Sequence, residues 1–329
     1  MTIRWGIIGC GHIAKTFVSS FNAVEGATLV ACAASEHQRA QAFAKEHGIA
    51  KTYEDYHALV QSNDIDVVYI ATTHNFHFEH IKLCLAHNKH VLCEKPLCIN
   101  AKQAREIQAL AKTQQRLVVE AVWTRFLPAI QSLKEMLDNK VIGNITSVYC
   151  NFSLNRELAD EHRLMNPKLA GGALLDLGIY PITFADIVFD EKPSRANASA
   201  IKSHTGVDKV SSYMLTYSDG ASALLSAGFK QSAVIEAKVH GELGYIEIPH
   251  FLGANCFTVH LDGKDPKTYS YPYNDTEKFR FEIEHVNNCL KKHYSDSPIL
   301  SLSKSIDLLD IMDELRTQFE LVYDDDEYH

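Results

Sequence analysis

The chain has 329 residues, of which 46% are hydrophobic and 22% are charged, and its formal net charge is -9 at pH 7. A chain of this length exceeds what one hydrophobic core usually organises, so two domains are expected. The ordinary balance of apolar and charged residues argues against long disorder. The negative charge and scattered Lys and Arg residues argue against a nucleic-acid partner, because phosphate binding needs a concentrated cationic face.

The cysteines and the apolar stretches predict a cytoplasmic protein with no membrane partner. The 8 cysteines show no paired Cys-x-x-Cys spacing, and several stand in apolar stretches where a thiol packs like a small hydrophobe. A reducing compartment is therefore favoured over a disulfide framework. No signal-peptide pattern opens the chain, and no apolar stretch approaches the ~18 residues that would span a bilayer.

The first third of the chain alternates short apolar runs with amphipathic stretches. The apolar runs are expected to be buried strands: Ile3–Ile8, Thr28–Ala33, Asp66–Thr72, His90–Glu94 and Leu117–Ala121. The amphipathic stretches are expected to be helices: Ile13–Val24, Gln38–His47, Asp55–Gln61, Phe76–His87 and Ala101–Lys112. Asn100 is expected to cap the last helix and Gly48 to end the second. This order predicts an α/β Rossmann domain with a parallel sheet over residues 1–122.

The pattern changes after Ala121, and residues 123–329 are predicted to form a second, α+β domain for substrate binding and dimerisation. After a helix, longer alternating runs predict a large open, mainly antiparallel sheet: Ile145–Phe152, Val210–Tyr217, Ala221–Phe229, Ala233–His240 and Tyr245–Ile248. The helices of this half are expected at Pro128–Asp138, Ala173–Phe189, Glu277–Lys292 and Ser303–Leu321, the last three covering one face of the sheet. Asp219-Gly220 is expected to be a hairpin turn, and the acidic tail 324–327 a solvated end.

A glycine-rich turn stands between the first expected strand and the first expected helix and reads Gly9-Cys10-Gly11-His12-Ile13-Ala14. Gly9 permits a tight turn, Gly11 lets the backbone approach a pyrophosphate at the helix N-terminus, and the small last residue lets the helix pack on the sheet. Because the turn lies in a complete strand–helix–strand unit, we expect it to bind a dinucleotide, with His12 and Ile13 among the cofactor-binding residues.

The turn after the second strand indicates which dinucleotide is bound. It reads Ala34-Ser35-Glu36-His37-Gln38-Arg39 and has no acidic residue directly at the strand end to bind a ribose 2′-hydroxyl. Ser35 and Arg39 could hold a 2′-phosphate, whereas Glu36 opposes one unless it turns to solvent. NADP is therefore favoured over NAD. The alternative, in which Arg39 is an ordinary solvated helix residue, stays open.

Three further motifs give the chain a family resemblance: Glu94-Lys95-Pro96, Trp123-Thr124-Arg125-Phe126 and Gly171-Gly172-Ala173-Leu174-Leu175-Asp176-Leu177-Gly178-Ile179-Tyr180. With them, the chain resembles the Gfo/Idh/MocA family of oxidoreductases over essentially its whole length. Within the family it looks most like the dimeric dihydrodiol dehydrogenases and the NADP-dependent D-xylose dehydrogenases. The resemblance implies a Rossmann domain followed by a domain with a large open sheet, through which members commonly form homodimers.

The resemblance also implies the catalytic residues. Lys95 of the Glu-Lys-Pro motif would lie at the nicotinamide and the substrate, and Asp176 and Tyr180 would face it. Much of the family has His where this chain has Tyr180, which points to the dihydrodiol and xylose branch. The departure leaves open whether Lys95 or Tyr180 is the immediate proton acceptor.

The residues themselves suit this chemistry. Hydride transfer from a secondary alcohol needs a base that takes the hydroxyl proton. Lys95 follows an expected strand, at the sheet edge where ligands collect, and Pro96 restricts its backbone. Asp176 and Tyr180 are four apart and share one face of a helix. A surface Lys and a core Tyr with a satisfied hydroxyl are the structural alternatives.

The remaining cofactor-side candidates follow expected strands. Thr72, His74 and His77 match the family's cofactor loop. A metal is not expected there, because a helical His face with no nearby carboxylate or thiol is a weak site.

Glu94, Trp123 and Arg125 complete the predicted site. The Trp123 indole could line the nicotinamide or substrate pocket, and the Arg125 guanidinium could bind a polar group of the substrate. A core Trp and an interdomain salt bridge are the alternatives.

The sequence therefore predicts an NADP-preferring dehydrogenase or reductase that acts on a hydroxyl or carbonyl carbon of a sugar or cyclic diol. A non-catalytic NADP(H)-binding redox sensor or regulator is the alternative, and reduction of a linear tetrapyrrole or deoxysugar carbonyl is an enzymatic one.

Overall fold

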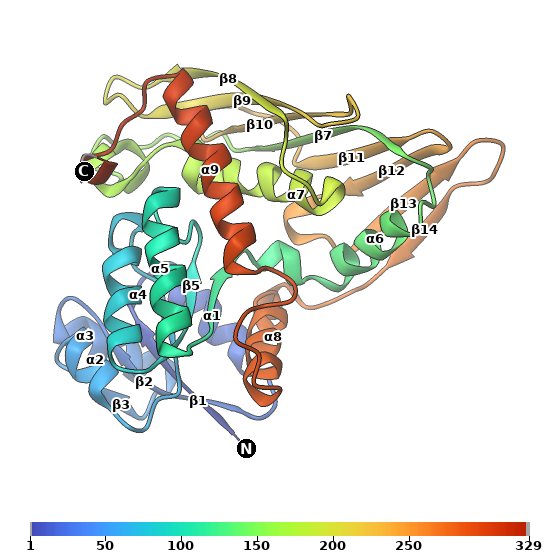
Figure 1. Cartoon of the computed structure of the whole chain (residues 1–329). Helices are drawn as coiled ribbons and strands as arrows, with labels where there is room; N and C mark the ends of the chain where they lie inside the picture. Colours follow the sequence, from blue (N-terminus) through green and yellow to red (C-terminus); the bar gives the residue numbers. More distant parts are fainter. Residues whose placement is uncertain (1, 327–329) are drawn as a thin grey trace. The chain divides into compact units, whose positions relative to one another are not determined.

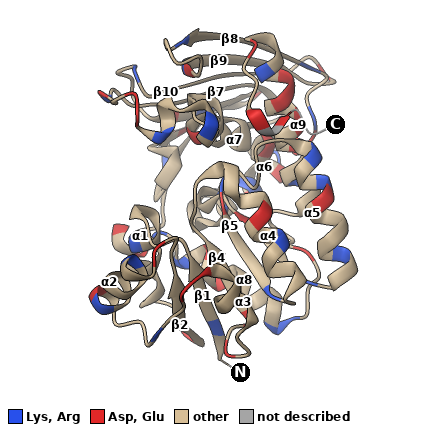
Figure 2. Cartoon of the chain, turned by 90° about the vertical axis from the view of Figure 1, so that its left-hand side faces the viewer, with Lys and Arg blue, Asp and Glu red and all other residues tan. Residues whose placement is uncertain are grey.

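A computed structural model describes residues 2–326 and divides the chain into two compact units (Figure 1). One unit holds the residues up to Trp123 together with Asn274–Ile306, and the other holds Thr124–Tyr273 and the described residues from Asp307 onward. The predicted division at residues 122 and 123 differs in one respect, because 274–306 returns to the first unit. Figure 2 shows Lys and Arg interspersed with Asp and Glu over the elements of each unit.

The first unit is built on a six-stranded parallel sheet with the order β3-β2-β1-β4-β5-β6. Its strands are β1 (Ile3–Ile8), β2 (Ala27–Ala33), β3 (Lys51–Thr52), β4 (Val67–Ile70), β5 (His90–Glu94) and β6 (Val118–Ala121). Its connecting helices are α1 (His12–Phe21), α2 (His37–His47), α3 (Tyr56–Gln61), α4 (His77–Ala86) and α5 (Ala101–Gln114). The strand order reverses between β1 and β4, which is where ligands bind in sheets of this kind.

The local signals read from the sequence of this unit are confirmed. Every residue of β4 is buried, as expected for a strand covered on both faces. The Asn100 side chain accepts a hydrogen bond from the Gln103 backbone N over 2.9 Å and caps α5. Gly48 ends α2 in the left-handed conformation, with φ at 69°.

Helix α8 (Arg280–Lys291) packs in the first unit, against α1. The Trp5 indole of β1 donates a hydrogen bond to Asn287 Oδ1 over 3.0 Å, and both side chains are buried. The prediction that this helix covers the second sheet is therefore wrong. The apolar face of an amphipathic helix shows that it packs, but it does not identify the surface against which it packs.

The second unit is built on an eight-stranded sheet with the order β14-β13-β12-β11-β7-β10-β9-β8. Its strands are β7 (Ile145–Ser153), β8 (Arg195–Lys202), β9 (Asp208–Thr216), β10 (Ser222–Gly228), β11 (Glu236–Gly241), β12 (Gly244–Pro249), β13 (Cys256–Leu261) and β14 (Lys267–Ser270). All neighbours are antiparallel except β7 and β10. The expected mainly antiparallel sheet is confirmed, although β8, β13 and β14 were not predicted.

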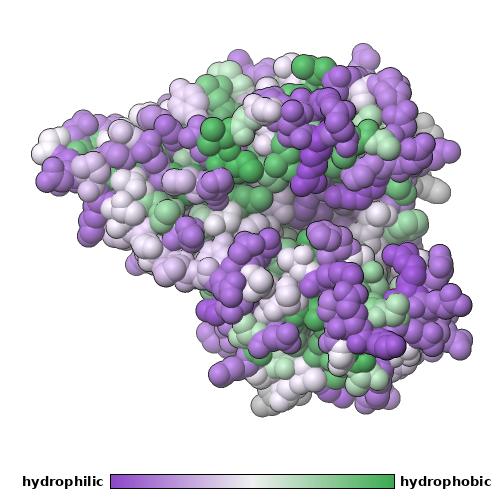
Figure 3. Space-filling model, turned by 180° about the vertical axis from the view of Figure 1, so that it is seen from behind, coloured by the Kyte–Doolittle hydropathy of each residue, from purple (hydrophilic) through white to green (hydrophobic). Residues whose placement is uncertain are grey.

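Helices cover one face of this sheet: α6 (Pro128–Asp138), α7 (Ile179–Phe189) and α9 (Leu302–Gln318) (Figure 1). On the other face, the side chains of Tyr149, Met214 and Leu224 are 46%, 46% and 40% exposed. Figure 3 shows apolar residues reaching the surface between polar ones. Short helical turns lie at η1 (His74–Phe76), η2 (Trp123–Phe126), η3 (Arg163–Met165), η4 (Pro167–Leu169), η5 (Leu174–Gly178), η6 (Phe251–Gly253), η7 (Asp275–Glu277) and η8 (Asp324–Asp326).

One helical stretch differs from the expectation that no segment is long and apolar enough to cross a bilayer. The stretch Pro167–Phe189 meets that test by length and composition, but 94% of its apolar window is buried inside the protein. Burial of this kind is typical of the core helix of a globular domain.

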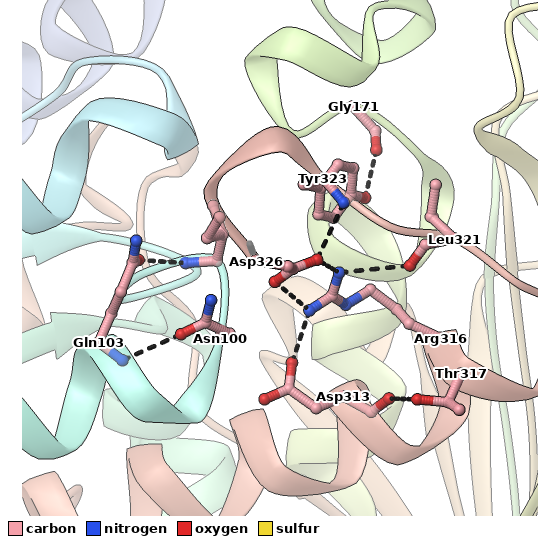
Figure 4. A network of polar contacts seen from close by, with 10 residues as sticks. Asn100, Gln103, Gly171, Asp313, Arg316, Thr317, Leu321, Tyr323 and Asp326 are labelled. Carbon is pink, nitrogen blue, oxygen red and sulfur yellow. Dashed lines mark hydrogen bonds and ion pairs between the residues drawn. The ribbon is translucent and has the colours of Figure 1, made fainter. Parts of the chain in front are cut away.

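The acidic tail differs from the predicted solvated end (Figure 4). Arg316, which is 4% exposed, donates to Asp326 Oδ2 over 2.6 Å and to Asp313 Oδ1 over 2.8 Å. The Tyr323 hydroxyl donates to the Gly171 carbonyl oxygen over 2.5 Å. The tail is thereby fixed to the turn that precedes α7, while Glu327 lies outside the described residues.

Candidate functional site

The glycine turn has the geometry of a dinucleotide cradle. Gly9 has a φ of +93°, and a Cβ there would lie 2.8 Å from the carbonyl carbon of Ala71 after β4. Gly11 precedes α1, and a Cβ there would meet nothing within 4 Å. The first glycine is therefore required by the tight turn, and the second leaves the helix N-terminus open to a phosphate. His12 is exposed and Ile13 half-buried in the first turn of the helix.

The two residues predicted to hold a 2′-phosphate lie together after β2. Arg39 Nη1 donates to Ser35 Oγ over 3.4 Å, and both side chains are exposed. Glu36 is also exposed and makes no capping hydrogen bond at the start of α2. A guanidinium and a hydroxyl that are exposed and adjacent can both donate to an added phosphate.

Lys95 follows the last residue of β5 and is half-buried. Its neighbour Glu94 is 8% exposed and accepts a hydrogen bond from the Tyr69 hydroxyl over 2.5 Å. The Leu97 backbone N donates to the buried Glu120 Oε1 over 2.8 Å. The loop that carries Lys95 is thus fixed on both sides of the residue, which restricts where its ammonium group can reach.

His77 joins this loop to the loop that follows β4. Its Nδ1 lies 2.8 Å from the Pro96 carbonyl oxygen, and its Nε2 lies 3.1 Å from the Thr72 carbonyl oxygen. Burial is the main cause that lowers the pKa of His77, to about 3, so the ring is neutral at pH 7. Both ring nitrogens of His77 thus contact backbone carbonyl oxygens. Of the other two residues predicted on this loop, Thr72 contacts the His80 ring through its hydroxyl, and His74 is 6% exposed.

A buried carboxyl of the first unit was missed in the sequence. Glu282 of α8 is 1% exposed, and neither of its carboxyl oxygens has a hydrogen-bond partner among the described residues. Burial, and secondly the charge of Glu94, raise the pKa of Glu282 well above its usual range. The spacing in the sequence could have indicated its burial, because Glu282 lies on the same helix face as the buried Phe279 and Val286.

Asp176 and Tyr180 lie in the second unit, where a π-helical turn passes into an α-helix. Asp176 stands inside the turn η5, and Tyr180 in the first turn of α7. Pro181 has no N–H and cannot donate to the Leu177 carbonyl oxygen, which explains a break in regular α-helical bonding at this place. Both side chains are nearly buried, and the Tyr180 ring meets Phe152 edge-on at 5.6 Å between centroids.

Arg163 is a second residue that sequence analysis missed. Its Nη2 donates to Asp176 Oδ1 over 3.0 Å. Nothing in the sequence marked it, because the segment 154–170 has no regular periodicity that would indicate where its side chains point. The structure makes Arg163 the charged partner of the predicted catalytic carboxylate.

Trp123 and Arg125 lie in different units. Trp123 is 8% exposed and meets the Phe279 ring at 5.6 Å between centroids. Arg125 forms a buried ion pair with Asp186 of α7 in its own unit. The structure thus gives Arg125 a carboxylate partner within the second unit.

Each unit therefore holds its own group of candidate residues. The first unit brings together the glycine turn, Thr72 and Lys95 at one sheet edge, and the second brings together Asp176, Tyr180 and Arg163. Within residues 2–326, no group of three His, Cys, Asp or Glu side chains could hold a metal ion.

Comparison with known proteins matches both units. Residues 3–122 match the model of an oxidoreductase family with an NAD-binding Rossmann fold, Gfo/Idh/MocA, and residues 130–247 match the model of that family's C-terminal domain. The trans-1,2-dihydrobenzene-1,2-diol dehydrogenase of Xenopus laevis is 34% identical over 98% of this chain and 100% of its own.

Solved structures agree in fold. KijD10, a 3-ketoreductase from Actinomadura kijaniata in complex with NADP and TDP-benzene, has a TM-score of 0.86 and 25% identity, covering 97% of this chain and 98% of its own. A levoglucosan dehydrogenase in complex with NADH and levoglucosan has a TM-score of 0.88 with the same coverage, and its 19% identity shows the fold alone.

Proposed function

The chain belongs to the Gfo/Idh/MocA family of oxidoreductases and has its NAD(P)-binding Rossmann domain, and we propose that it oxidises a hydroxyl of a sugar or cyclic diol, or reduces the corresponding carbonyl. One observation carries the proposal. The glycine turn, Thr72 and Lys95 follow β1, β4 and β5, which are parallel neighbours. The backbone proposed to bind the cofactor and the Lys proposed to be catalytic therefore stand at one edge of the sheet, which supports the proposal because ligands bind at this edge.

The residues divide the chemistry between them. A bound nicotinamide would accept or supply the hydride. Lys95 and Tyr180 together would take the hydroxyl proton during oxidation and return it during reduction, and Asp176 would support them by charge. The fixed loop around Lys95 suits this role, because proton transfer requires a base within hydrogen-bonding reach of the substrate oxygen.

The proposed cofactor is NADP rather than NAD. The exposed Ser35 and Arg39 lie within 3.4 Å of each other after β2. Glu36 lies between them in the sequence and is exposed, and its side chain makes no capping hydrogen bond at the start of α2, so it can turn to solvent. The pair supports a 2′-phosphate site next to the glycine turn.

We further propose a cytoplasmic homodimer that pairs through the open face of the second sheet. Tyr149, Met214 and Leu224 are exposed on adjacent strands of this face, and Ser212 and Ser226 between them are small. A flat face of small and apolar side chains suits a second copy of the same face, since two-fold interfaces are self-complementary.

The proposal is tested with purified protein, both cofactors in both redox states, and a panel of pentoses, hexoses and trans-cyclic diols with their carbonyl counterparts. Absorbance of the reduced nicotinamide is followed. Turnover of a sugar or cyclic diol, faster with NADP(H) than with NAD(H), is the expected result. Tight NADPH binding with no turnover across the panel would contradict the proposal and favour a non-catalytic redox sensor.

A further inference from the structure

Three polar side chains at the start of β9 form a buried chain of hydrogen bonds in the second unit. The Ser211 hydroxyl donates to Asp208 Oδ2 over 2.7 Å. The Tyr213 hydroxyl lies 2.5 Å from Ser211 Oγ, and it is the donor there, because Ser211 has one hydroxyl proton and gives it to Asp208. All three side chains are buried, so the chain is shielded from solvent.

An irregularity in β9 brings these side chains to one face of the sheet. Alternate residues of a strand share a face, so Asp208 would ordinarily face away from Ser211. The pairing of β8 with β9 skips one residue, Lys209, between the partners of Ile201 and Lys202. This extra residue is a β-bulge, and it turns Asp208 to the same face as Ser211.

Asp208 holds the first residue of the turn η5. The Leu174 backbone N donates to Asp208 Oδ2 over 2.8 Å, and both residues are buried. The first N–H groups of a helical turn have no partner inside it, and Ala173 at the cap position has no side-chain acceptor. The carboxylate of β9 therefore supplies an acceptor that Ala173 cannot provide.

Tyr213 lies against the last residue of the same turn. A Cβ at Gly178 would lie 2.5 Å from the Tyr213 hydroxyl oxygen, and a Cβ at Gly172, two residues before the turn, would overlap Asp208 Oδ1. Real Cβ atoms essentially never lie within 3.0 Å of a neighbour, so both glycines are required by the close approach of β9. The five-residue turn η5 thus rests on β9 at both of its ends.

We propose that Asp208, acting with Ser211 and Tyr213, is a positioning residue for the proposed acid–base chemistry. The inference rests on the proposed function of Asp176 and Tyr180. Asp176 lies inside η5 and Tyr180 two residues beyond its end, so a displacement of the turn moves both side chains. A misplacement of about 1 Å can lower a rate about 100-fold, because proton transfer needs hydrogen-bonding reach. Asp208 acts on the reaction only through the placement of these two groups.

The test measures kcat, KM and NADPH affinity of full-length variants with a sugar or cyclic diol that the wild type turns over. Asp208→Ala removes the hydrogen bonds to Leu174 and Ser211, so kcat should fall about tenfold or more while the Kd for NADPH stays near the wild-type value. Asp208→Asn keeps an oxygen that accepts from both donors, so its kcat should stay within about threefold of the wild type.

Tyr213→Phe allows a matched comparison. It removes a hydroxyl that donates to a serine beneath η5, so kcat should fall about threefold or more. Tyr271→Phe is the control, because the Tyr271 hydroxyl donates to Ser132 Oγ of α6 over 2.5 Å in the same unit, and kcat should be unchanged. Thermal unfolding checks each variant. Phenylalanine has nearly the volume of tyrosine, so Tyr213→Phe tests the proposal if Asp208→Ala does not fold.

A background without the Tyr180 hydroxyl separates positioning from general structural support. In Tyr180→Phe, Asp208→Ala should lower the residual kcat by a smaller factor than in the wild type, because one of the groups that it positions is already missing. Equal factors in the two backgrounds would overturn the proposal. Wild-type kcat in Asp208→Ala would do the same, as would equal losses in Asp208→Asn and Asp208→Ala. A wild type with no turnover on any sugar or cyclic diol instead refutes the proposed function, and the positioning role with it.

Discussion

Arg163 donates a hydrogen bond to Asp176 over 3.0 Å, and the guanidinium side chain is 42% exposed while the carboxylate side chain is 8% exposed. The arginine therefore reaches from the surface to a nearly buried charge beside Tyr180. A buried carboxylate is costly unless it is paired, so Arg163 both stabilises the charge of Asp176 and fixes its orientation.

Replacement of Arg163 should impair turnover. Hydrogen bonds to charged groups contribute about 1.5–3 kcal/mol, so Arg163→Met is expected to lower kcat/KM about tenfold or more. Arg163→Lys should retain part of the activity, because it keeps the charge but loses the planar guanidinium. The control is Arg156→Met, an exposed arginine of the same segment. Equal kinetics for Arg163→Met and the control would show that the pair does not support Asp176.

Replacement of Arg39 should change the preference between cofactors. Arg39→Ala removes a charge-assisted contact that only a 2′-phosphate would make, so the Kd for NADPH is expected to rise about tenfold or more while that for NADH stays nearly unchanged. Calorimetry with both cofactors measures the two constants. Gln38→Ala, a change at the preceding exposed position, is the control. Similar losses for both cofactors would argue against a 2′-phosphate contact.

Replacement of Glu282 should change the pH dependence of stability. Its raised pKa means that the folded state keeps a proton which the unfolded chain releases above its ordinary pKa of 4.5. The free energy of unfolding therefore falls as pH rises, by up to about 1.4 kcal/mol per pH unit for one proton. Glu282→Gln should remove this slope in urea unfolding above about pH 8, well beyond the ordinary pKa of 6.5 at which histidines such as His77 lose their proton in the unfolded chain.

The control for Glu282 is Glu284→Gln on the same helix, whose side chain is 41% exposed. This variant should keep the wild-type slope. A slope unchanged in Glu282→Gln would show that Glu282 is ionised in the folded protein.

The proposed dimer predicts the effect of a charge on the open face of the second sheet. Leu224→Arg places a charge on each of the two paired faces where the proposed interface would bury it, so light scattering should report a monomer at concentrations where the wild type is a dimer. Leu243→Arg, which changes a residue 56% exposed between β11 and β12, is the control. A dimer that persists in Leu224→Arg would place the interface elsewhere.

Much of the fold could be predicted because buried strands and helices leave patterns of apolar residues in the sequence. The strands of the first unit are continuous apolar runs, except for the unpredicted edge strand β3 with its two polar residues, and Asn100 and Gly48 mark helix ends by their own chemistry. The edge strands β8 and β14 escaped prediction because they are polar and largely exposed, and an edge strand needs no apolar pattern. The place of α8 escaped because it depends on a contact between Trp5 and Asn287, which lie far apart in the chain.

The candidate site could be predicted where residue type and local position suffice. The glycine turn, Lys95 and the Asp176–Tyr180 pair stand in recognisable motifs at strand or helix ends. Arg163 and His77 act through contacts made across loops, with Asp176 and with Pro96, and the sequence does not specify such partners. The ion pair of Arg125 with Asp186 is likewise a contact that the sequence does not specify, and the predicted ligand contact of Arg125 stays a prediction.

The central claim is that proton transfer at a dinucleotide site requires Lys95, which shares this role with Tyr180, and Lys95→Met tests it most directly. Kinetics and NADPH binding are measured on the same preparation, with Lys112→Met on the exposed surface of α5 as the control. General acid–base catalysis contributes roughly 10²–10⁴-fold, so kcat should fall by about that factor while the Kd for NADPH stays near the wild-type value. Turnover close to that of the wild type, with NADPH binding retained, would contradict the account.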